Sequence, residues 1–291
     1  MTLEVLATGP LTSVQDEGRV GFASWGVPRS GACDRGAYRL GLRLLGNPPG
    51  AASLEVTLGG LAVRAVRPVV VAVTGARCPG APWNAPTSLA AGQVLRLGTP
   101  AQGLRSYLAV RGGVEVLPVL GSRSTCTLSG LGPPRVRAGD VLPVGSATTD
   151  MPGVDEAPVP APVGGTVVLA VEPGPRRDRF DDDGWSRLLG TTWTVGTDSD
   201  RVGVRLDGVR LGPATGWRGV ELPSEGVLRG AVQVPPSGEP VVFLADCPVT
   251  GGYPVLAYLR DPVRGSAVDR LAQARPGQQL RFSWSRSGPG A

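Results

Sequence analysis

Residues 224–254 read SEGVLRGAVQVPPSGEPVVFLADCPVTGGYP, a stretch that combines turn signals with a short apolar run at 241–245. Glycine adopts backbone angles that other residues avoid, and proline fixes φ, so this composition specifies turn geometry tightly. The pattern predicts a β-hairpin whose exit carries the polar residues Asp246, Thr250 and Tyr253. These groups fit a small-molecule site, while turn chemistry alone favours a purely structural role for the stretch.

The composition of the whole chain favours an all-β protein. Its 291 residues include 44 Gly and 29 Pro, which divide the sequence into short apolar runs. Such punctuation is typical of β-proteins, and this length accommodates two ordinary domains. Residues 145–165 lose the apolar pattern and are rich in Pro, Ala and acid, as linkers are. We therefore expect domains at 1–147 and 165–291, with a linker at 148–164.

The local patterns predict many strands and few helices. Strands are expected at 1–7, 53–58, 61–66, 68–74, 166–171, 193–195, 201–206 and 255–258. Helices are expected at 34–45, 181–189 and 266–274, with Asp34 and Ser266 at cap positions. Three segments, at 91–97, 138–144 and 276–282, each place a Gly turn before an alternating strand. Either a duplicated β-domain or a recurring turn explains this similarity.

The charged residues and cysteines exclude several classes of site. The chain contains no Lys, so its 29 basic residues are all Arg, and its formal net charge is +5. The arginines are scattered, which favours a solvated surface over a nucleic-acid interface. The four cysteines lie far apart without a Cys-x-x-Cys pair, which favours reduced thiols over disulfides or a zinc site. No apolar run approaches the ~20 residues that span a bilayer and no signal-peptide pattern is present, so we expect a cytoplasmic protein.

The absence of His narrows the possible chemistry further. It excludes Ser-His-Asp and Cys-His catalysis and removes the commonest ligand of catalytic zinc, so we expect no metal site. Acid–base chemistry must use Asp, Glu, Tyr, Cys or a group of the substrate. Without Lys a P-loop cannot form, and no Rossmann fingerprint follows a strand, so no nucleotide site of known type is expected.

Four polar clusters exceed what folding requires. They are Gln15, Asp16, Arg19, Ser30 and Asp34; Arg111 with residues 121–125; Ser199, Asp200 and Arg201; and Ser224, Glu225, Gln233, Asp246, Thr250 and Tyr253. In the second cluster, Arg111 and Arg123 with nearby Gly amides and hydroxyls suit a carboxylate, carbamate or phosphate. The neighbours Asp200 and Arg201 equally fit a structural ion pair.

Several motifs keep a characteristic order along nearly the whole chain. They are VQDEGR at 14–19, GVPRSGACD at 26–34, GNP at 46–48, RGG at 111–113, GSRS at 121–124, SDRVG at 199–203, SEG at 224–226 and TGGYP at 250–254. Taken together, they resemble the biotin-dependent carboxyltransferase family. That family includes allophanate hydrolase subunit 2, KipA, the C subunit of bacterial 5-oxoprolinase and part of urea carboxylase.

The resemblance implies a fold, partners and cofactors. The fold is a pair of cyclophilin-like β-barrel domains with few short helices. The obligate partner is a KipI-like subunit 1, equivalent to allophanate hydrolase subunit 1 or to the B subunit of 5-oxoprolinase, and the active cleft forms between the two proteins. A LamB/YcsF-like protein, the A subunit of 5-oxoprolinase, is a further expected partner, and the substrate is a small amide. The isolated chain binds no cofactor, whereas the assembly uses ATP, with biotin carried by a partner as an open alternative.

The residue types in these motifs support roles for individual residues. Catalytic roles fall to Asp16 or Asp246 as proton carriers and to Ser124 as a hydrogen-bond donor. The expected substrate-binding residues are Gln15, Arg19, Ser30, Arg111, Arg123, Glu225, Gln233, Thr250 and Tyr253. Within this set, Arg111 and Arg123 hold a carboxylate or oxyanion.

The sequence departs from the family pattern at two places. Cys33 stands where Met is expected, and Cys247 with Pro248 stands where Arg-Gln is expected, which weakens an anion-binding role for that loop. The favoured function is a subunit of an ATP-dependent 5-oxoprolinase. The alternative is a KipA-like regulatory protein that sequesters a KipI-like partner and catalyses nothing.

Overall fold

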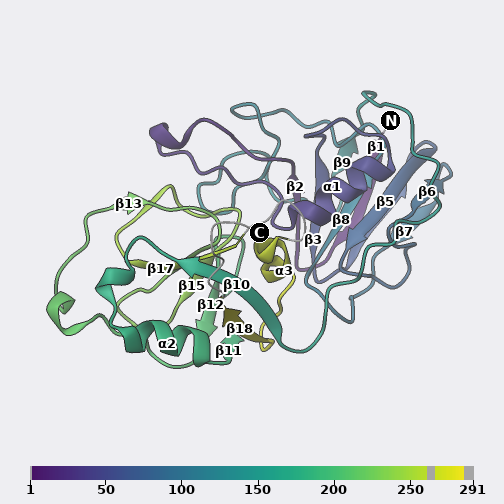
Figure 1. Ribbon diagram of the computed structural model, residues 1–291. Coiled ribbons are helices and arrows are strands. Elements are labelled where there is room, and N and C mark those ends of the chain that lie inside the picture. The colour runs from purple at the N-terminus through teal and green to yellow at the C-terminus, as the bar shows by residue number, and fades with distance from the viewer. Residues whose placement is uncertain (1, 261–265, 285–291) are drawn as a thin grey trace. The chain divides into compact units, whose positions relative to one another are not determined.

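The computed structural model describes residues 2–260 and 266–284, and these form two compact units (Figure 1). The first unit contains the residues up to Phe22 together with Arg29–Val163. The second contains Ala23–Pro28 and the described residues from Gly164 onward. The chain is mainly β with few short helices, which confirms the fold class predicted from the sequence.

Two antiparallel sheets form the first unit. Its elements are β1 (Thr2–Thr8), β2 (Leu11–Gln15), α1 (Arg35–Leu44), β3 (Ser53–Thr57), β4 (Leu61–Ala65), β5 (Val69–Gly75), β6 (Pro86–Leu89), β7 (Val94–Arg96), β8 (Arg105–Val110) and β9 (Val141–Pro143). The strand orders are β7-β4-β1-β9 and β2-β3-β8-β5-β6. Alternate residues point to one face of a strand, so Leu54, Val63 and Leu108 can meet in a shared apolar core.

Helix α1 covers the five-stranded sheet at β5 and β8 (Figure 1). Its apolar stripe places Leu40 and Leu44 against Ala72 and Ala109 of these strands. The carboxylate of Asp34 accepts a 2.9 Å hydrogen bond from the amide of Ala37, as an N-cap should. The predicted helix and its cap are confirmed.

A closed barrel dominates the second unit. Its elements are η1 (Ala23–Trp25), β10 (Val167–Pro173), η2 (Arg177–Arg179), α2 (Asp182–Gly190), β11 (Trp193–Val195), β12 (Gly203–Asp207), η3 (Thr215–Trp217), β13 (Glu225–Gly226), β14 (Ala231–Gln233), β15 (Val241–Phe243), β16 (Thr250–Gly251), β17 (Val255–Leu259), α3 (Ala267–Ala272) and β18 (Gln279–Ser283). Seven strands close in the order β10-β17-β14-β15-β12-β11-β18. Closure leaves these strands without an open edge. No helix in the described residues combines the length and apolar character needed to cross a bilayer.

The stretch at 224–254 forms the predicted hairpin within this barrel. Strands β14 and β15 pair antiparallel, with Val232 opposite Val242. The connecting turn is closed by a 2.9 Å hydrogen bond from Gly238 to the carbonyl of Pro235, and Gly238 has a φ of 80°. Beyond the hairpin, β13 pairs with β16, which joins Glu225 to the loop at the far end of the stretch.

The three similar turn segments adopt one geometry. In the turns at 90–93, 137–140 and 275–278, the fourth amide donates to the first carbonyl at 3.0, 3.1 and 3.0 Å. The side chains of Gln93, Asp140 and Gln278 accept hydrogen bonds from the first amide of their own turns. The third residue is always Gly, with φ of 81°, 93° and 82°. A left-handed position and a capping side chain therefore account for the sequence similarity.

Candidate functional site

Asp16 is enclosed by hydrogen-bond donors in the first unit. Its Oδ1 accepts from the amide of Gly18 at 2.8 Å and from the hydroxyl of Ser122 at 2.7 Å, and also from the hydroxyl of Ser124. Its Oδ2 accepts a 2.6 Å bond from the amide of Arg123. The side chain is buried. These bonds tie the loop after β2 to residues 122–124, so the first two predicted polar clusters meet.

The other predicted residues of the first cluster join this assembly. The Nε2 atom of Gln15 donates to the Ser13 hydroxyl and to the carbonyl of Thr125, both at 2.9 Å. The hydroxyl of Ser30 donates to the same Thr125 carbonyl at 3.2 Å, and Arg19 donates to the carbonyl of Ser124 at 2.6 Å. All three side chains are buried. They therefore order the loops around Asp16 in this conformation.

Arg111 and Arg123 have different surroundings. Arg123 pairs with Glu115 and donates to the carbonyl of Val116 at 2.8 Å. Arg111 instead donates to the carbonyl of Leu45 at 2.5 Å, just beyond α1, and to the carbonyl of Thr149 at 3.0 Å. It also lines a pocket of about 320 Å³, whose other lining residues are Pro68, Val69, Val70, Ser88, Leu89, Gly145, Ser146 and Thr148. Of the two predicted anion-binding arginines, Arg111 therefore faces a concave surface with hydroxyl groups.

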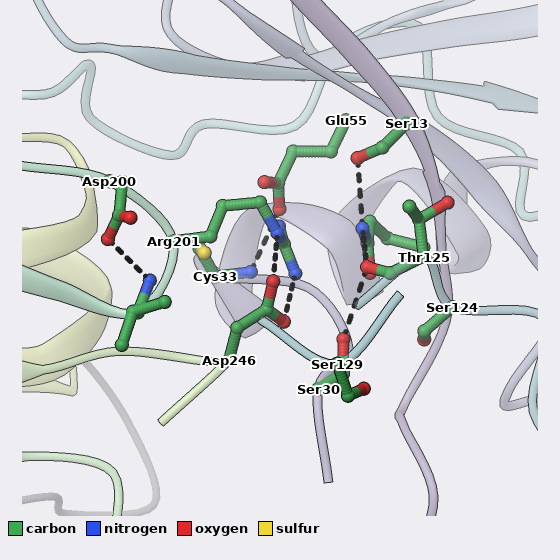
Figure 2. A network of polar contacts seen from close by, with 12 residues as sticks. Ser13, Ser30, Cys33, Glu55, Ser124, Thr125, Ser129, Asp200, Arg201 and Asp246 are labelled. Carbon is green, nitrogen blue, oxygen red and sulfur yellow. Dashed lines mark hydrogen bonds and ion pairs between the residues drawn. The ribbon is translucent and has the colours of Figure 1, made fainter. Parts of the chain in front are cut away.

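Asp246 is fully buried in the second unit and forms a two-point ion pair (Figure 2). Its Oδ2 and Oδ1 atoms lie 3.1 Å from Nε and Nη2 of Arg201, respectively. Asp200 has another role, because its Oδ1 accepts hydrogen bonds from the amides of Val202 at 2.7 Å and Gly203 at 3.1 Å. Arg201 thus pairs with the acid at the end of the hairpin.

The remaining predicted residues of the second unit lie on or beside β13 and β16. Gln233 donates to the carbonyl of Tyr253 at 2.9 Å, which fixes the loop after β16. The side chains of Thr250 and Tyr253 are exposed, with Tyr253 at 47%. Glu225 projects from β13 and receives two hydrogen bonds from Nε of Arg176, at 2.9 and 3.0 Å. This ribbon therefore presents polar groups to solvent.

Arg176 is a site residue that sequence reasoning missed. Its hydrogen bonds and positive charge lower the pKa of Glu225 below the ordinary glutamate value. The Glu225 charge in turn adds to burial in raising the pKa of Tyr258. The signal was present in the sequence as the Arg-rich turn PRRDR at 175–179, but nothing in it indicates which acid each arginine meets.

A second missed cluster surrounds Glu55 in the first unit. Its Oε2 accepts a 2.9 Å hydrogen bond from the amide of Cys33 (Figure 2). The same atom accepts a 2.7 Å hydrogen bond from the Tyr107 hydroxyl. The Nε atom of Arg105 lies 3.7 Å from Oε1, and both side chains are buried. Burial, and then the charge of Glu55, raises the pKa of Tyr107. The cluster anchors the loop that enters α1, and an acid inside the apolar strand at 53–57 was its sequence signal.

The family model of the carboxyltransferase domain, subdomains A and B, matches residues 25–284. This chain belongs to the carboxyltransferase family. Within that family it is 37% identical to the C subunit of 5-oxoprolinase from Escherichia coli strain K12, over 96% of this chain and 90% of the relative.

Two solved structures share the fold of this chain. The structure of TTHA0988 superimposes with a TM-score of 0.85 at 35% identity, over 97% of this chain and 55% of that one. The urea amidolyase of K. lactis gives a TM-score of 0.86 at 29% identity, over 97% of this chain and 18% of that one. This carboxyltransferase chain thus spans about half of TTHA0988 and a smaller part of the amidolyase.

Proposed function

We propose that this chain is the C subunit of an ATP-dependent 5-oxoprolinase, which opens the cyclic amide of 5-oxoproline to give glutamate. The observation that carries the proposal is the 37% identity to the C subunit of the Escherichia coli 5-oxoprolinase, because it covers 96% of this chain and 90% of that relative. By contrast, the match to the K. lactis urea amidolyase covers only 18% of that chain. A match along nearly the full length of both proteins favours a common role.

We further propose that the chain acts together with separate partners. In TTHA0988 the matching region is 55% of a longer polypeptide, so the counterpart of this chain is covalently joined to further protein. A separate protein can replace such a fused segment. The proposed partners are a KipI-like subunit 1, equivalent to the B subunit of 5-oxoprolinase, and a LamB/YcsF-like protein as the A subunit. In this proposal the assembly consumes ATP, no cofactor is held by this chain alone, and biotin on a partner is the alternative.

The buried acids of this chain fit positioning roles in that reaction. Asp16 already accepts hydrogen bonds from four donors, and Asp246 is fully buried against Arg201. Ser124 donates to Asp16. We therefore assign proton transfer to exposed groups or to the partner, and substrate contact to exposed groups such as Thr250 and Tyr253.

The test is reconstitution with the KipI-like and LamB/YcsF-like proteins from the same genome. Glutamate formed from 5-oxoproline is measured with and without ATP, and each protein is omitted in turn. We expect turnover only with ATP and all subunits present. A stable complex with the KipI-like protein but without turnover in the full mixture would instead support the regulatory alternative.

A further inference from the structure

The side chain of Arg179 is placed differently from those of its two neighbouring arginines. Arg176 pairs with Glu225, and Arg177 lies 3.5 Å from Asp182. Arg179 lies over the ring of Trp217 instead, with its Cζ atom 3.5 Å from the ring centroid. Its Nε atom is buried and has no hydrogen-bond partner within the described part of the chain. The ring of Trp217 thus fixes the guanidinium of Arg179 in place.

The stack is held from two elements of the second unit. Arg179 ends η2 and Trp217 ends η3, and the amide of Ala214 donates a 2.9 Å hydrogen bond to the carbonyl of Arg179. When a guanidinium lies flat on an aromatic ring, its N–H groups stay in the plane of the guanidinium and point outward, past the edge of the ring. Because the guanidinium is already ordered, a ligand loses less conformational entropy when it binds there.

Arg179 has no ion-pair partner within the described part of the chain, whereas its two neighbouring arginines each have one. Glu225 is the acid whose pKa responds to Arg179, and Arg176 holds that carboxylate with direct hydrogen bonds. Both guanidinium groups therefore act on this carboxylate, and the charge of Asp178 acts on Arg176 as well. A planar carboxylate matches the fork formed by the two terminal nitrogens of arginine, so it can form two parallel hydrogen bonds there while Nε stays buried.

We propose that Arg179, stacked on Trp217, binds the carboxylate of a small ligand at the surface of the second unit. Resting on the proposed function, the ligand is 5-oxoproline, which carries one carboxylate. Arg176 and Glu225 act as positioning residues, because their ion pair keeps the acid from occupying Arg179.

The test is a titration of the isolated chain with sodium 5-oxoproline, followed by NMR of the tryptophan indole N–H signals. The signal of Trp217 is identified by its loss in Trp217→Phe. We expect this signal to shift saturably with 5-oxoproline but not with the neutral 5-oxoprolinamide. Arg179→Met should weaken binding at least tenfold, and Arg179→Lys, which keeps the charge but loses the fork, at least threefold.

Arg187→Met is the matched control, since it also removes one arginine from the second unit, where Arg187 pairs with Asp183 on the exposed face of α2. It should leave binding within twofold of the unchanged chain. Equal affinity in Arg179→Met, with folding verified by circular dichroism, overturns the site. Phosphate binding as tight as that of 5-oxoproline overturns the assignment to a carboxylate.

The same variants separate this site from the proposed function. If the reconstituted complex converts 5-oxoproline and Arg179→Met leaves its KM unchanged, the site is wrong and the function stands. If the complex is inactive but the chain binds 5-oxoproline through Arg179, the site stands and the function is wrong. If Arg179→Met raises the KM of an active complex at least tenfold, with a smaller change in kcat, the result supports both the site and the proposed function.

Discussion

Nε and Nη2 of Arg201 each lie 3.1 Å from a carboxylate oxygen of Asp246, and both side chains are buried. Removing one member of a buried ion pair leaves the other charge uncompensated. Asp246→Asn should therefore lower the free energy of unfolding by about 3–5 kcal/mol. Urea denaturation followed by circular dichroism measures this change.

The double variant Arg201→Met with Asp246→Leu is the control for that pair. Because it removes both charges together, it should recover most of the stability lost in Asp246→Asn. An unchanged urea midpoint in Asp246→Asn, together with loss of turnover in the complex, would instead support a direct catalytic role for Asp246.

Variants at Asp16 and its donors test whether this buried acid positions the surrounding loops or takes part in the reaction. Ser122→Ala and Ser124→Ala each remove one hydroxyl donor to Oδ1, so each should cost about 1.5–3 kcal/mol of unfolding free energy. Asp16→Ala leaves all the hydrogen-bond donors to its carboxylate without a partner. It should therefore lower the unfolding free energy more than either serine variant does. Urea denaturation provides the measurement. If Asp16→Asn retains full stability but abolishes turnover, Asp16 takes part in the chemistry directly.

The sequence predicts local structure well because local rules act over a few residues. The cap at Asp34, the turn at Gly238 and the apolar stripe of α1 each depend on near neighbours. Partners across long sequence separations are different. Arg176 meets Glu225 at a separation of 49 residues, and Arg201 meets Asp246 at 45. Residue type identifies such groups as candidates, but the pairing of distant strands decides which acid each arginine reaches.

The contacts within the candidate site were likewise not predictable from the sequence. Gly and polar residues identified the loops around Asp16 as a candidate site, yet they gave no indication that its carboxylate would be enclosed by four donors. Burial of Glu55 with Tyr107 likewise depends on the register of β3 against β8. A polar residue in a short apolar strand signals such a cluster, but its partners require the pairing.

Alkaline pH should destabilise the first unit through Tyr38 and Tyr107. Burial raises the pKa of both hydroxyls, with a further contribution from the charge of Asp16 at Tyr38 and of Glu55 at Tyr107. Since the folded pKa is raised, this contribution is fully present below about pH 10, where unfolded tyrosine ionises, and is lost as pH rises through the folded pKa. Stability should therefore fall by about 1.4 kcal/mol per pH unit for each buried tyrosine.

Urea midpoints between pH 9 and pH 11 test this dependence. Tyr107→Phe and Tyr38→Phe should each make stability fall less steeply with pH, by the contribution of the one tyrosine removed. This holds even though each variant also loses a hydrogen bond at neutral pH. The exposed Tyr253→Phe should keep the original slope. Identical slopes in all three variants would contradict the assignment.

The Arg176–Glu225 pair predicts a pH effect of opposite sign. The Glu225 pKa is lowered by its hydrogen bonds to Arg176, so their interaction is fully present above the unfolded glutamate pKa and is lost as pH falls through the folded pKa. Carbon-13 NMR of the Glu225 carboxyl should give a midpoint below the ordinary value. Arg176→Met should raise that midpoint toward the ordinary value, and Arg179→Met should raise it less, because Arg179 acts on Glu225 only through its charge. A larger effect of Arg179→Met than of Arg176→Met would mean that Glu225 pairs mainly with Arg179, which would contradict an open carboxylate site there.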